Sequence, residues 1–450
     1  MTGMTIEKAL RACSGRYCGE GDLGAELGRV VIDSREILPG DLFVAYRGER
    51  VDGHDYISAA LDKGAACCLA ERVPVGENRG VIVADDVQRA LEDIAAAYRD
   101  TLSIPIVGIT GSVGKTSAKE MISAVLSSRW RVRKTDKNLN NQIGVPMTLS
   151  RITPEDEIAV VEMGISGFGE MSRLGRMVRP KIAVYTLIGH AHLEFLHDLD
   201  GVLRAKTEML DYLPEDGCVI NNGDDEKLKA FSFNRRSVSF GLGKNCAVRA
   251  ENVAASTEGT DCDVVCGERR LHVHSPAFGR HLVYAALEGA AVGMEMGLSD
   301  EEIVRGIASF KTVGRRSAVV RTGGITLLDD CYNSNAEALH SGIDSLMELP
   351  GRKVCILGDM LELGDTAYEA HFGGGSYARE KGVARLLCCG EYASAYCDGA
   401  GDIARRFPDR AALIAALDEE IRDGDCVLVK ASRGSHFEEI SEALNRRRDD

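Results

Sequence analysis

The sequence predicts an α/β protein of three domains: a small N-terminal α/β domain, a central P-loop domain with a parallel sheet, and a C-terminal doubly wound, Rossmann-like domain. Three observations support this fold class. The chain has 450 residues, about three times a common domain length. Short apolar strands alternate with helical segments over most of the chain, which is typical of parallel sheets covered on both faces. A glycine-rich loop that ends in Lys115 follows one of these strands.

Residues 1–103 are predicted to form the first domain, which ends in the polar stretch 99–103. Its apolar runs and helical spacing indicate strands at 30–32, 42–45 and 80–83 and helices at 56–63 and 87–98.

Residues 104–313 and 314–450 are predicted to form the second and third domains. The second shows strands at 104–110, 158–161 and 182–187, a β-hairpin of 262–266 and 271–274, a helix at 282–296 and another that begins with a capping box at Ser299. The third shows strands at 325–328, 354–357, 386–389 and 426–429, which alternate with helices such as 411–421.

Composition and charge exclude several classes of protein. With 44% hydrophobic and 27% charged residues, the chain has globular rather than disordered or collagen-like composition. The net charge of −15 repels phosphate backbones, so no nucleic-acid partner is expected. No run of about 18 apolar residues is present, and the N-terminal residues lack the apolar segment of a secretion signal. We therefore expect no membrane span and a cytoplasmic location.

The 14 cysteines are predicted to be free thiols in a reducing compartment. No Cys-x-x-Cys pair is present, which disfavours a zinc knuckle or a thioredoxin-type site. The doublets Cys67-Cys68 and Cys388-Cys389 lie in apolar, strand-like runs, where cysteine acts as a small hydrophobe. Cys262 and Cys266 fall in the predicted hairpin.

The most specific motif is the loop between the strand 104–110 and a helix that runs to about Ser128. Glycines let the backbone N–H groups turn toward phosphate oxygens, and a helix N-terminus adds a favourable field. Lys115 would reach the β and γ phosphates, and the Thr116 hydroxyl would ligate Mg²⁺. Ile109 stands where the longer form of this motif has glycine. The predicted nucleotide-binding residues are Gly111, Ser112, Val113, Gly114, Lys115, Thr116 and Ser117.

Two further strand ends carry groups that suit a metal site. Glu162 follows the strand 158–161, where its carboxylate could hold Mg²⁺ directly or through water. His192 follows the strand 182–187. A histidine near a strand end is often structural, but its coincidence with the phosphate loop on a neighbouring strand favours a ligand role.

These motifs, with others along the whole chain, are similar to those of the Mur ligase family, the ATP-dependent amide-forming enzymes of peptidoglycan synthesis. The resemblance is carried by Asp33-Ser34-Arg35, 39–45, 47–55, 110–117, 138–146, 162–164, 192–194, Arg204-Ala205-Lys206, 329–335, 357–364 and 430–434. The Asp-Asp-x-Tyr-Asn-x-Asn and Gly-Asp-Met-x-Glu-Leu-Gly blocks of the third domain resemble one branch of the family in particular.

The resemblance implies a monomeric, cytoplasmic ligase that joins D-alanyl-D-alanine to UDP-N-acetylmuramoyl-tripeptide through an acyl phosphate. Such a reaction serves peptidoglycan precursor synthesis and hence cell shape and division. The alternatives are a related ligase with another amine acceptor and a non-catalytic paralogue that binds nucleotide and UDP-peptide. Because a pure binder would not need the second metal set, the presence of Glu162, His192 and Lys206 together favours an enzyme.

The resemblance also implies roles for individual residues. ATP and two Mg²⁺ ions are the expected cofactors, with Lys115 and Lys206 catalytic and Lys206 carrying a carbamate. The implied metal ligands are Thr116, Glu162, His192 and Lys206. The implied UDP-substrate residues are Ser34 and Arg35.

The third domain is implied to complete the site. Either Arg315 or Arg316 would reach the nucleotide, and we favour Arg315. The residues implied to line the acceptor or nucleotide cleft are Asp330, Tyr332, Asn333, Lys430, Ser432 and Arg433. For these six, a structural role in strand-end turns is the alternative.

The sequence departs from the family pattern where adenine would bind. Leu187 stands where relatives usually have asparagine, and Leu282 and Ala285 replace two more amides. An apolar pocket can stack on any purine but discriminates little between exocyclic groups. The sequence therefore predicts weak discrimination between ATP and GTP, unless backbone groups supply the missing recognition.

Overall fold

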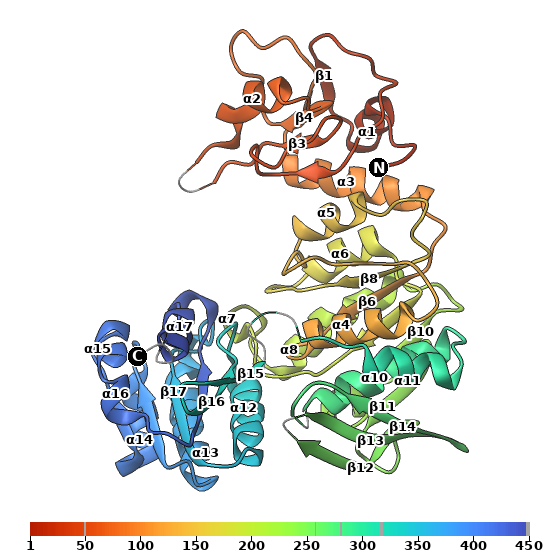
Figure 1. Cartoon of the computed structure of the whole chain (residues 1–450). Helices are drawn as coiled ribbons and strands as arrows, with labels where there is room; N and C mark the ends of the chain where they lie inside the picture. Colours follow the sequence, from red (N-terminus) through yellow and green to blue (C-terminus); the bar gives the residue numbers. More distant parts are fainter. Residues whose placement is uncertain (49–50, 257, 280, 313, 315–317, 447–450) are drawn as a thin grey trace.

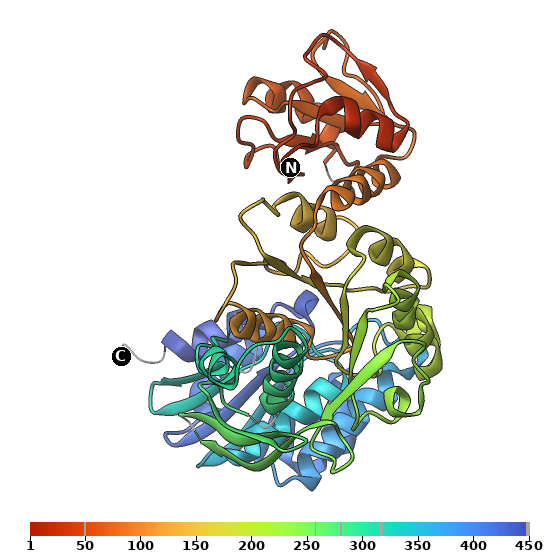
Figure 2. The ribbon, with the colours of Figure 1, turned by 90° about the vertical axis from the view of Figure 1, so that its right-hand side faces the viewer.

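The computed structural model describes residues 1–48, 51–256, 258–279, 281–312, 314 and 318–446. The chain folds around three sheets of five, nine and six strands, which follow one another along the sequence (Figure 1). Figure 2 shows the first sheet and its helices at one end of the molecule, next to helices of the central part. The three-domain α/β fold predicted from the sequence is confirmed.

The first sheet has strands β2 to β5 parallel and β1 antiparallel at its edge. In sheet order the strands are β1 (Arg16–Cys18), β5 (Val81–Val83), β4 (Cys67–Ala70), β3 (Leu42–Val44) and β2 (Val30–Val31). The helices are α1 (Ile6–Cys13), α2 (Ile57–Asp62) and α3 (Val87–Thr101), with the 3₁₀ helix η1 (Gly53–Tyr56) before α2. On α3, the fully buried Glu92 accepts from Arg173 of the central domain at 3.0 Å, which ties the first domain to the second.

The central sheet is parallel from β7 to β12 and antiparallel at β13 and β14. In sheet order its strands are β14 (Arg269–Ser275), β13 (Gly259–Cys266), β12 (Val248–Ser256), β11 (Arg236–Gly241), β10 (Cys218–Asn222), β9 (Ile182–Tyr185), β6 (Ile106–Thr110), β8 (Ile158–Glu162) and β7 (Val132–Lys134). The predicted antiparallel hairpin is thus present, within longer strands than expected.

Helices cover both faces of the central sheet, and a separate apolar cluster lies between the helices and the sheet on each face. They are α4 (Lys115–Leu126), α5 (Gly144–Ser150), α6 (Glu170–Val178), α7 (Leu193–Leu196), α8 (Leu199–Thr207), the 3₁₀ helix η2 (Glu208–Tyr212), α9 (Glu226–Ala230), α10 (His281–Glu295) and α11 (Asp300–Ala308). Strand β6 lies between β8 and β9, so connections from neighbouring strands leave in opposite directions there. Ligands bind at the carboxyl edge of such a switch point.

The third sheet is parallel apart from its edge strand β15. In sheet order the strands are β15 (Ala318–Thr322), β16 (Ile325–Asp329), β20 (Asp425–Lys430), β17 (Arg352–Leu357), β18 (Arg385–Cys388) and β19 (Ala404–Arg406). The helices are α12 (Ala336–Glu348), α13 (Ala367–Glu380), α14 (Ala393–Ala400), α15 (Arg410–Ala415), α16 (Leu417–Glu420) and α17 (Glu438–Arg446), with 3₁₀ turns η3 (Gly364–Thr366), η4 (Gly401–Ile403) and η5 (Arg433–Ser435).

One helix predicted for this domain is wrong, because the structure has two shorter helices in its place. The segment 411–421 forms the two short helices α15 and α16, which meet at Ala416. The Ala416 amide donates to the carbonyl of Leu413 at 3.1 Å, an i to i−3 bond that tightens the chain. The second helix is held by Glu420, which pairs with Arg385 at 2.7 Å.

All 14 cysteines are free thiols, as predicted. In the described ranges, no helix combines the length and apolar character needed to cross a membrane.

Candidate active site

The predicted phosphate loop connects β6 to α4 and has a shape that only glycine permits at two positions. Gly111 and Gly114 have φ of 151° and 87°. A Cβ atom on Gly111 would lie 1.9 Å from the Thr186 hydroxyl, so no side chain fits there. The Ser112 amide donates to the Leu187 carbonyl at 2.7 Å, which anchors the loop to the chain after β9. The loop is therefore fixed by its neighbours before any nucleotide binds.

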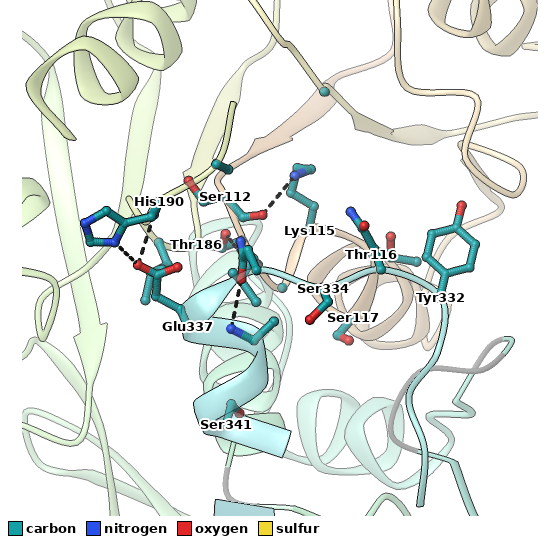
Figure 3. A pocket seen from close by; sticks show the side chains of 18 of the residues that line it. Ser112, Lys115, Thr116, Ser117, Thr186, His190, Tyr332, Ser334, Glu337 and Ser341 are labelled. Carbon is teal, nitrogen blue, oxygen red and sulfur yellow. Dashed lines mark hydrogen bonds and ion pairs between the residues drawn. The ribbon is translucent and has the colours of Figure 1, made fainter. Parts of the chain in front are cut away.

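Lys115 is the first residue of α4 and folds back over the loop. Its Nζ donates to the Gly111 carbonyl at 2.6 Å and lies 3.4 Å from the carbonyl oxygen of Ser112. A lysine ammonium over a glycine-rich turn at a helix N-terminus is typical of phosphate-binding loops. Figure 3 shows Lys115 with Thr116 and Ser117 along the cavity described below.

Glu162 ends β8 next to the loop, where a group of polar side chains surrounds its carboxylate. It is 2% exposed. The Thr116 hydroxyl donates to Oε2 at 3.0 Å, and Asn140 Nδ2 donates to Oε1 at 2.8 Å. The buried Lys119 ammonium lies 3.7 Å from Oε2. Carboxylate and hydroxyl oxygens, which Mg²⁺ prefers as ligands, thus meet beside the phosphate loop.

His192 faces the third domain rather than Glu162. It precedes α7 with φ of 56°, and its Nδ1 lies 2.5 Å from Oε2 of Glu362. The hydrogen bond with His192 lowers the pKa of the Glu362 carboxyl. Within the described residues, no three His, Cys, Asp or Glu side chains are placed to hold one metal ion. Of the four predicted metal ligands, Thr116 and Glu162 contact each other, whereas His192 contacts Glu362 of the third domain.

Lys206 lies on α8, is 1% exposed and does not line the cavity. Burial lowers the pKa of its ammonium well below the ordinary value, and the charge of nearby Lys115 lowers it further. No carboxylate of the described chain contributes to its charge state. A neutral amine is the form of lysine that can react with carbon dioxide, so the environment of Lys206 fits the predicted carbamate.

The central and third domains line a common cavity of about 740 Å³. From the central domain it is lined by the phosphate loop, Glu162 and His192. Figure 3 shows Ser112, Lys115 and Thr116 of the central domain along this cavity, with Tyr332 of the third domain next to Thr116 and Glu337 next to His190. All six residues predicted for the cleft line this cavity: Asp330, Tyr332, Asn333, Lys430, Ser432 and Arg433.

The internal contacts of these six residues also give them a structural role. The 2%-exposed Lys430 contacts the Asp330 carboxylate and donates to the Asn333 carbonyl at 3.1 Å, which holds the turn after β16. The Arg433 guanidinium lies over the Tyr332 ring at 5.5 Å. The same side chains thus line the cavity and hold the strand-end turns.

The remaining predicted residues lie outside the cavity or outside the described chain. Ser34 and Arg35 belong to the first domain, and neither lines the cavity. Arg35 is bound to Asp33 at 2.7 Å, and this hydrogen bond lowers the pKa of the Asp33 carboxyl to about 2. The predicted nucleotide arginines, Arg315 and Arg316, lie outside the described residues.

The end of the cavity near β10 contains polar groups that the sequence analysis missed. Asn222 ends β10 and Asp224 follows it, and Tyr284 and Glu288 lie on α10. A sequence signal was available for Glu288, because it is the single charged residue in the apolar run 282–294. Glu337 and Glu362, which contact His190 and His192, were also missed, since these contacts form only when the domains meet.

The structure also corrects the placement of Leu282. Ala285 lines the cavity as expected, but Leu282 does not. It is 2% exposed and belongs to the apolar cluster between α4, α10 and the sheet.

Three family models match successive parts of the chain. The Mur ligase family catalytic domain matches 26–105, the Mur ligase middle domain 109–293 and the Mur ligase glutamate ligase domain 315–433.

Curated relatives match over nearly the full length. The chain is 35% identical over 425 residues to the UDP-N-acetylmuramoyl-tripeptide–D-alanyl-D-alanine ligase of Bacillus subtilis, covering 92% of both chains. It is 35% identical over 433 residues to the enzyme of the same name from Escherichia coli, covering 93% of this chain and 94% of that one.

Solved structures agree with these matches. MurF from Acinetobacter baumannii superposes with a TM-score of 0.89 at 27% identity, over 98% of this chain and 99% of that one. MurF ligase from Thermotoga maritima in complex with ADP has a TM-score of 0.84 at 28% identity, over 93% of this chain and 97% of that one.

Proposed function

Because the chain belongs to the Mur ligase family, we propose that it joins D-alanyl-D-alanine to UDP-N-acetylmuramoyl-tripeptide at the expense of ATP, in peptidoglycan precursor synthesis. The observation that carries this proposal is the cavity shared by two domains. One wall is a phosphate loop, and the other is the segment Asp330–Asn333 that resembles the branch of the family with this acceptor. The 35% identity to enzymes of this name over at least 92% of the chain supports the same activity.

The central wall suits phosphoryl transfer. The loop amides and the Lys115 ammonium would bind and neutralise the phosphates, which is most of what catalysis of this step requires. Thr116 and Glu162 would hold Mg²⁺, as their adjacent oxygens fit this ion. When bound, the ion supplies further neutralisation of phosphate charge.

The chemistry needs two steps because a carboxylate is a poor electrophile. First, an oxygen of the tripeptide carboxylate attacks the γ-phosphorus of ATP, the bond to the ADP oxygen breaks, and an acyl phosphate forms. The amine of the dipeptide then attacks the acyl carbon, the carbon–oxygen bond to phosphate breaks, and an amide forms with loss of one proton. A cavity between two domains suits this order of steps because a closed site excludes water, which would hydrolyse the acyl phosphate.

Lys206 would contribute a carbamate. Its neutral amine attacks the carbon of carbon dioxide, a nitrogen–carbon bond forms and one proton is released. The basic amine is thereby replaced by an anionic carbamate. That anion would lie near the Lys115 charge, which now disfavours the ammonium form of Lys206. The change turns an electrostatic repulsion into an attraction.

The outer parts of the substrates would bind beyond the described cavity. Ser34 and Arg35 would hold the uridine diphosphate end, and Arg315 would reach the nucleotide from the third domain. The free thiols fit a reducing environment, which supports a cytoplasmic reaction.

The direct test is mass spectrometry of the products formed from ATP and a UDP-muramoyl tripeptide offered mixed dipeptides and amino acids. The proposal predicts a product heavier by one D-alanyl-D-alanine residue pair and phosphate release that requires both peptide and amine. Incorporation of another amine would identify a related ligase. Hydrolysis of ATP without either substrate, and no product, would reject ligase activity.

A further inference from the structure

Helix α10 brings a single carboxyl group to the end of the cavity near β10. Glu288 lines the cavity one helical turn after Ala285 and is only 3% exposed. Its neighbours along the helix are apolar, and burial raises the pKa of the Glu288 carboxyl well above the ordinary value. Burial therefore favours the protonated carboxylic acid, which offers one O–H donor and one carbonyl acceptor.

The Glu288 carboxyl has no internal partner to explain its burial. No hydrogen bond or ion pair to it occurs within the described residues, and burial alone accounts for its altered pKa. Leaving a buried polar group without a partner is unfavourable. Such a group at the wall of a cavity suggests that a ligand supplies the partner.

The other polar side chains at this end are already committed to the protein. Asn222 Nδ2 donates to the Thr186 carbonyl at 2.9 Å, and Asn222 Oδ1 accepts from the Asp224 amide at 2.9 Å. Asp224 accepts from the Tyr284 hydroxyl at 3.0 Å and from the Gly243 amide at 2.9 Å.

Asp225, which also lines the cavity, is committed as well. It accepts from the amides of Ile188 and Leu228 at 2.6 and 2.9 Å. Among these side chains, Glu288 is the one whose donor and acceptor remain available in the described structure.

We propose that Glu288 is a specificity residue that recognises the adenine ring of ATP. Its carbonyl oxygen would accept from the 6-amino group, and its hydroxyl would donate to an adjacent ring nitrogen. Adenine presents such a donor beside an acceptor, so one neutral carboxylic acid matches both. This inference rests on the proposed function in taking ATP as the nucleotide, and it opposes the weak discrimination predicted from Leu187 and Ala285.

The most selective probe is a nucleotide that lacks only the 6-amino group. Purine riboside 5′-diphosphate has the phosphates, ribose and ring of ADP, so a difference in affinity reports on that amino group. Guanine is less diagnostic, because a carboxylic acid can turn around and satisfy its oxygen and ring N–H. Isothermal titration calorimetry with the full chain and each diphosphate measures the ratio of dissociation constants without any peptide substrate.

The wild-type protein should bind ADP about 10-fold more tightly than purine riboside diphosphate, as expected for one hydrogen bond to a buried partner. Glu288→Gln should keep most of this ratio, because an amide also offers a donor and an acceptor. Glu288→Met, similar in length but unable to form these bonds, should reduce the ratio to less than about 3-fold. Glu288→Ala should behave like Glu288→Met, and it replaces that variant if Glu288→Met does not fold.

The matched control is Glu295→Gln, on the same helix but outside the cavity, where the carboxylate pairs with Arg236. It should keep the wild-type ratio. A wild-type ratio near one, or an unchanged ratio in the methionine or alanine variant, overturns the proposal. The product assay separates the two claims: a wild-type protein that makes no amide but keeps the ADP preference would reject the ligase function alone.

Discussion

His192 of the central domain contacts Glu362 of the third domain, with 2.5 Å between Nδ1 and Oε2. A second contact lies beside it, where the His190 amide donates to Glu337 at 2.9 Å. Both histidines follow β9, close to the phosphate loop. The side chain predicted to serve the metal site thus holds the third domain in the arrangement seen here through Nδ1, which leaves Nε2 as its second ring nitrogen.

The division of the cavity between two domains predicts that substrates rearrange these domains. Binding a non-hydrolysable ATP analogue together with the UDP-tripeptide should compact the protein, because the two halves of the site lie on separate domains joined near 312–316 and closure excludes water. Small-angle X-ray scattering should show a smaller radius of gyration with both ligands than with the UDP-peptide alone. An unchanged radius of gyration, with binding of both ligands verified, would contradict domain closure.

Lys115→Ala should abolish ligation while leaving the fold intact. The side chain lies over the loop carbonyls rather than in an apolar core, so its loss leaves no cavity. Removal of a charge that neutralises the transferring phosphoryl group should lower kcat/KM on the order of 10³-fold. Phosphate release in the presence of both substrates measures this, and thermal unfolding checks the fold.

The control for Lys115→Ala is Lys181→Ala, whose ammonium pairs with Asp216 outside the cavity. It should remain close to wild type. Activity of Lys115→Ala within tenfold of wild type would show that the loop does not bind the transferred phosphate in the proposed way.

The phosphate loop and the polar strand ends beside it could be predicted because each depends on a short local pattern. Glycines at 111 and 114 must bend the chain, and Lys115 must start the helix. The carboxyl ends of neighbouring parallel strands necessarily meet at one edge, which brings Glu162 to Thr116.

Features that depend on how whole elements pack could not be predicted in the same way. The partner of His192 depends on the orientation of two domains, and no local pattern encodes that orientation. The core position of Leu282 depends on how α10 packs against α4 and the sheet. The short helix after Ala416 contacts β18 through the pair of Glu420 with Arg385, a contact between segments far apart in the sequence.

Lys206 should be essential as a carbamate rather than as a cation. Lys206→Ala should lose activity on the order of 10²–10³-fold, as when one electrostatic stabiliser is removed from an active site. A short carboxylic acid added to this variant should restore part of the activity by supplying an anion. Lys206→Arg is the matched control, since it keeps a positive charge but cannot form the carbamate. Full activity of the arginine variant would disprove the carbamate role.

Glu288 should make folding less favourable as the pH rises. Its carboxyl has a raised pKa when folded, so above its ordinary value of 4.5 the folded protein keeps a proton that the unfolded chain has lost. The free energy of unfolding then falls with increasing pH, by at most about 1.4 kcal/mol per pH unit for one proton. Glu288→Gln has no such proton and should lose this contribution to the slope. Urea unfolding of the nucleotide-free protein at a series of pH values above 4.5 compares the two chains. The stability of the glutamine variant relative to wild type should increase steadily with pH, whereas parallel profiles would show that Glu288 ionises normally in the folded state.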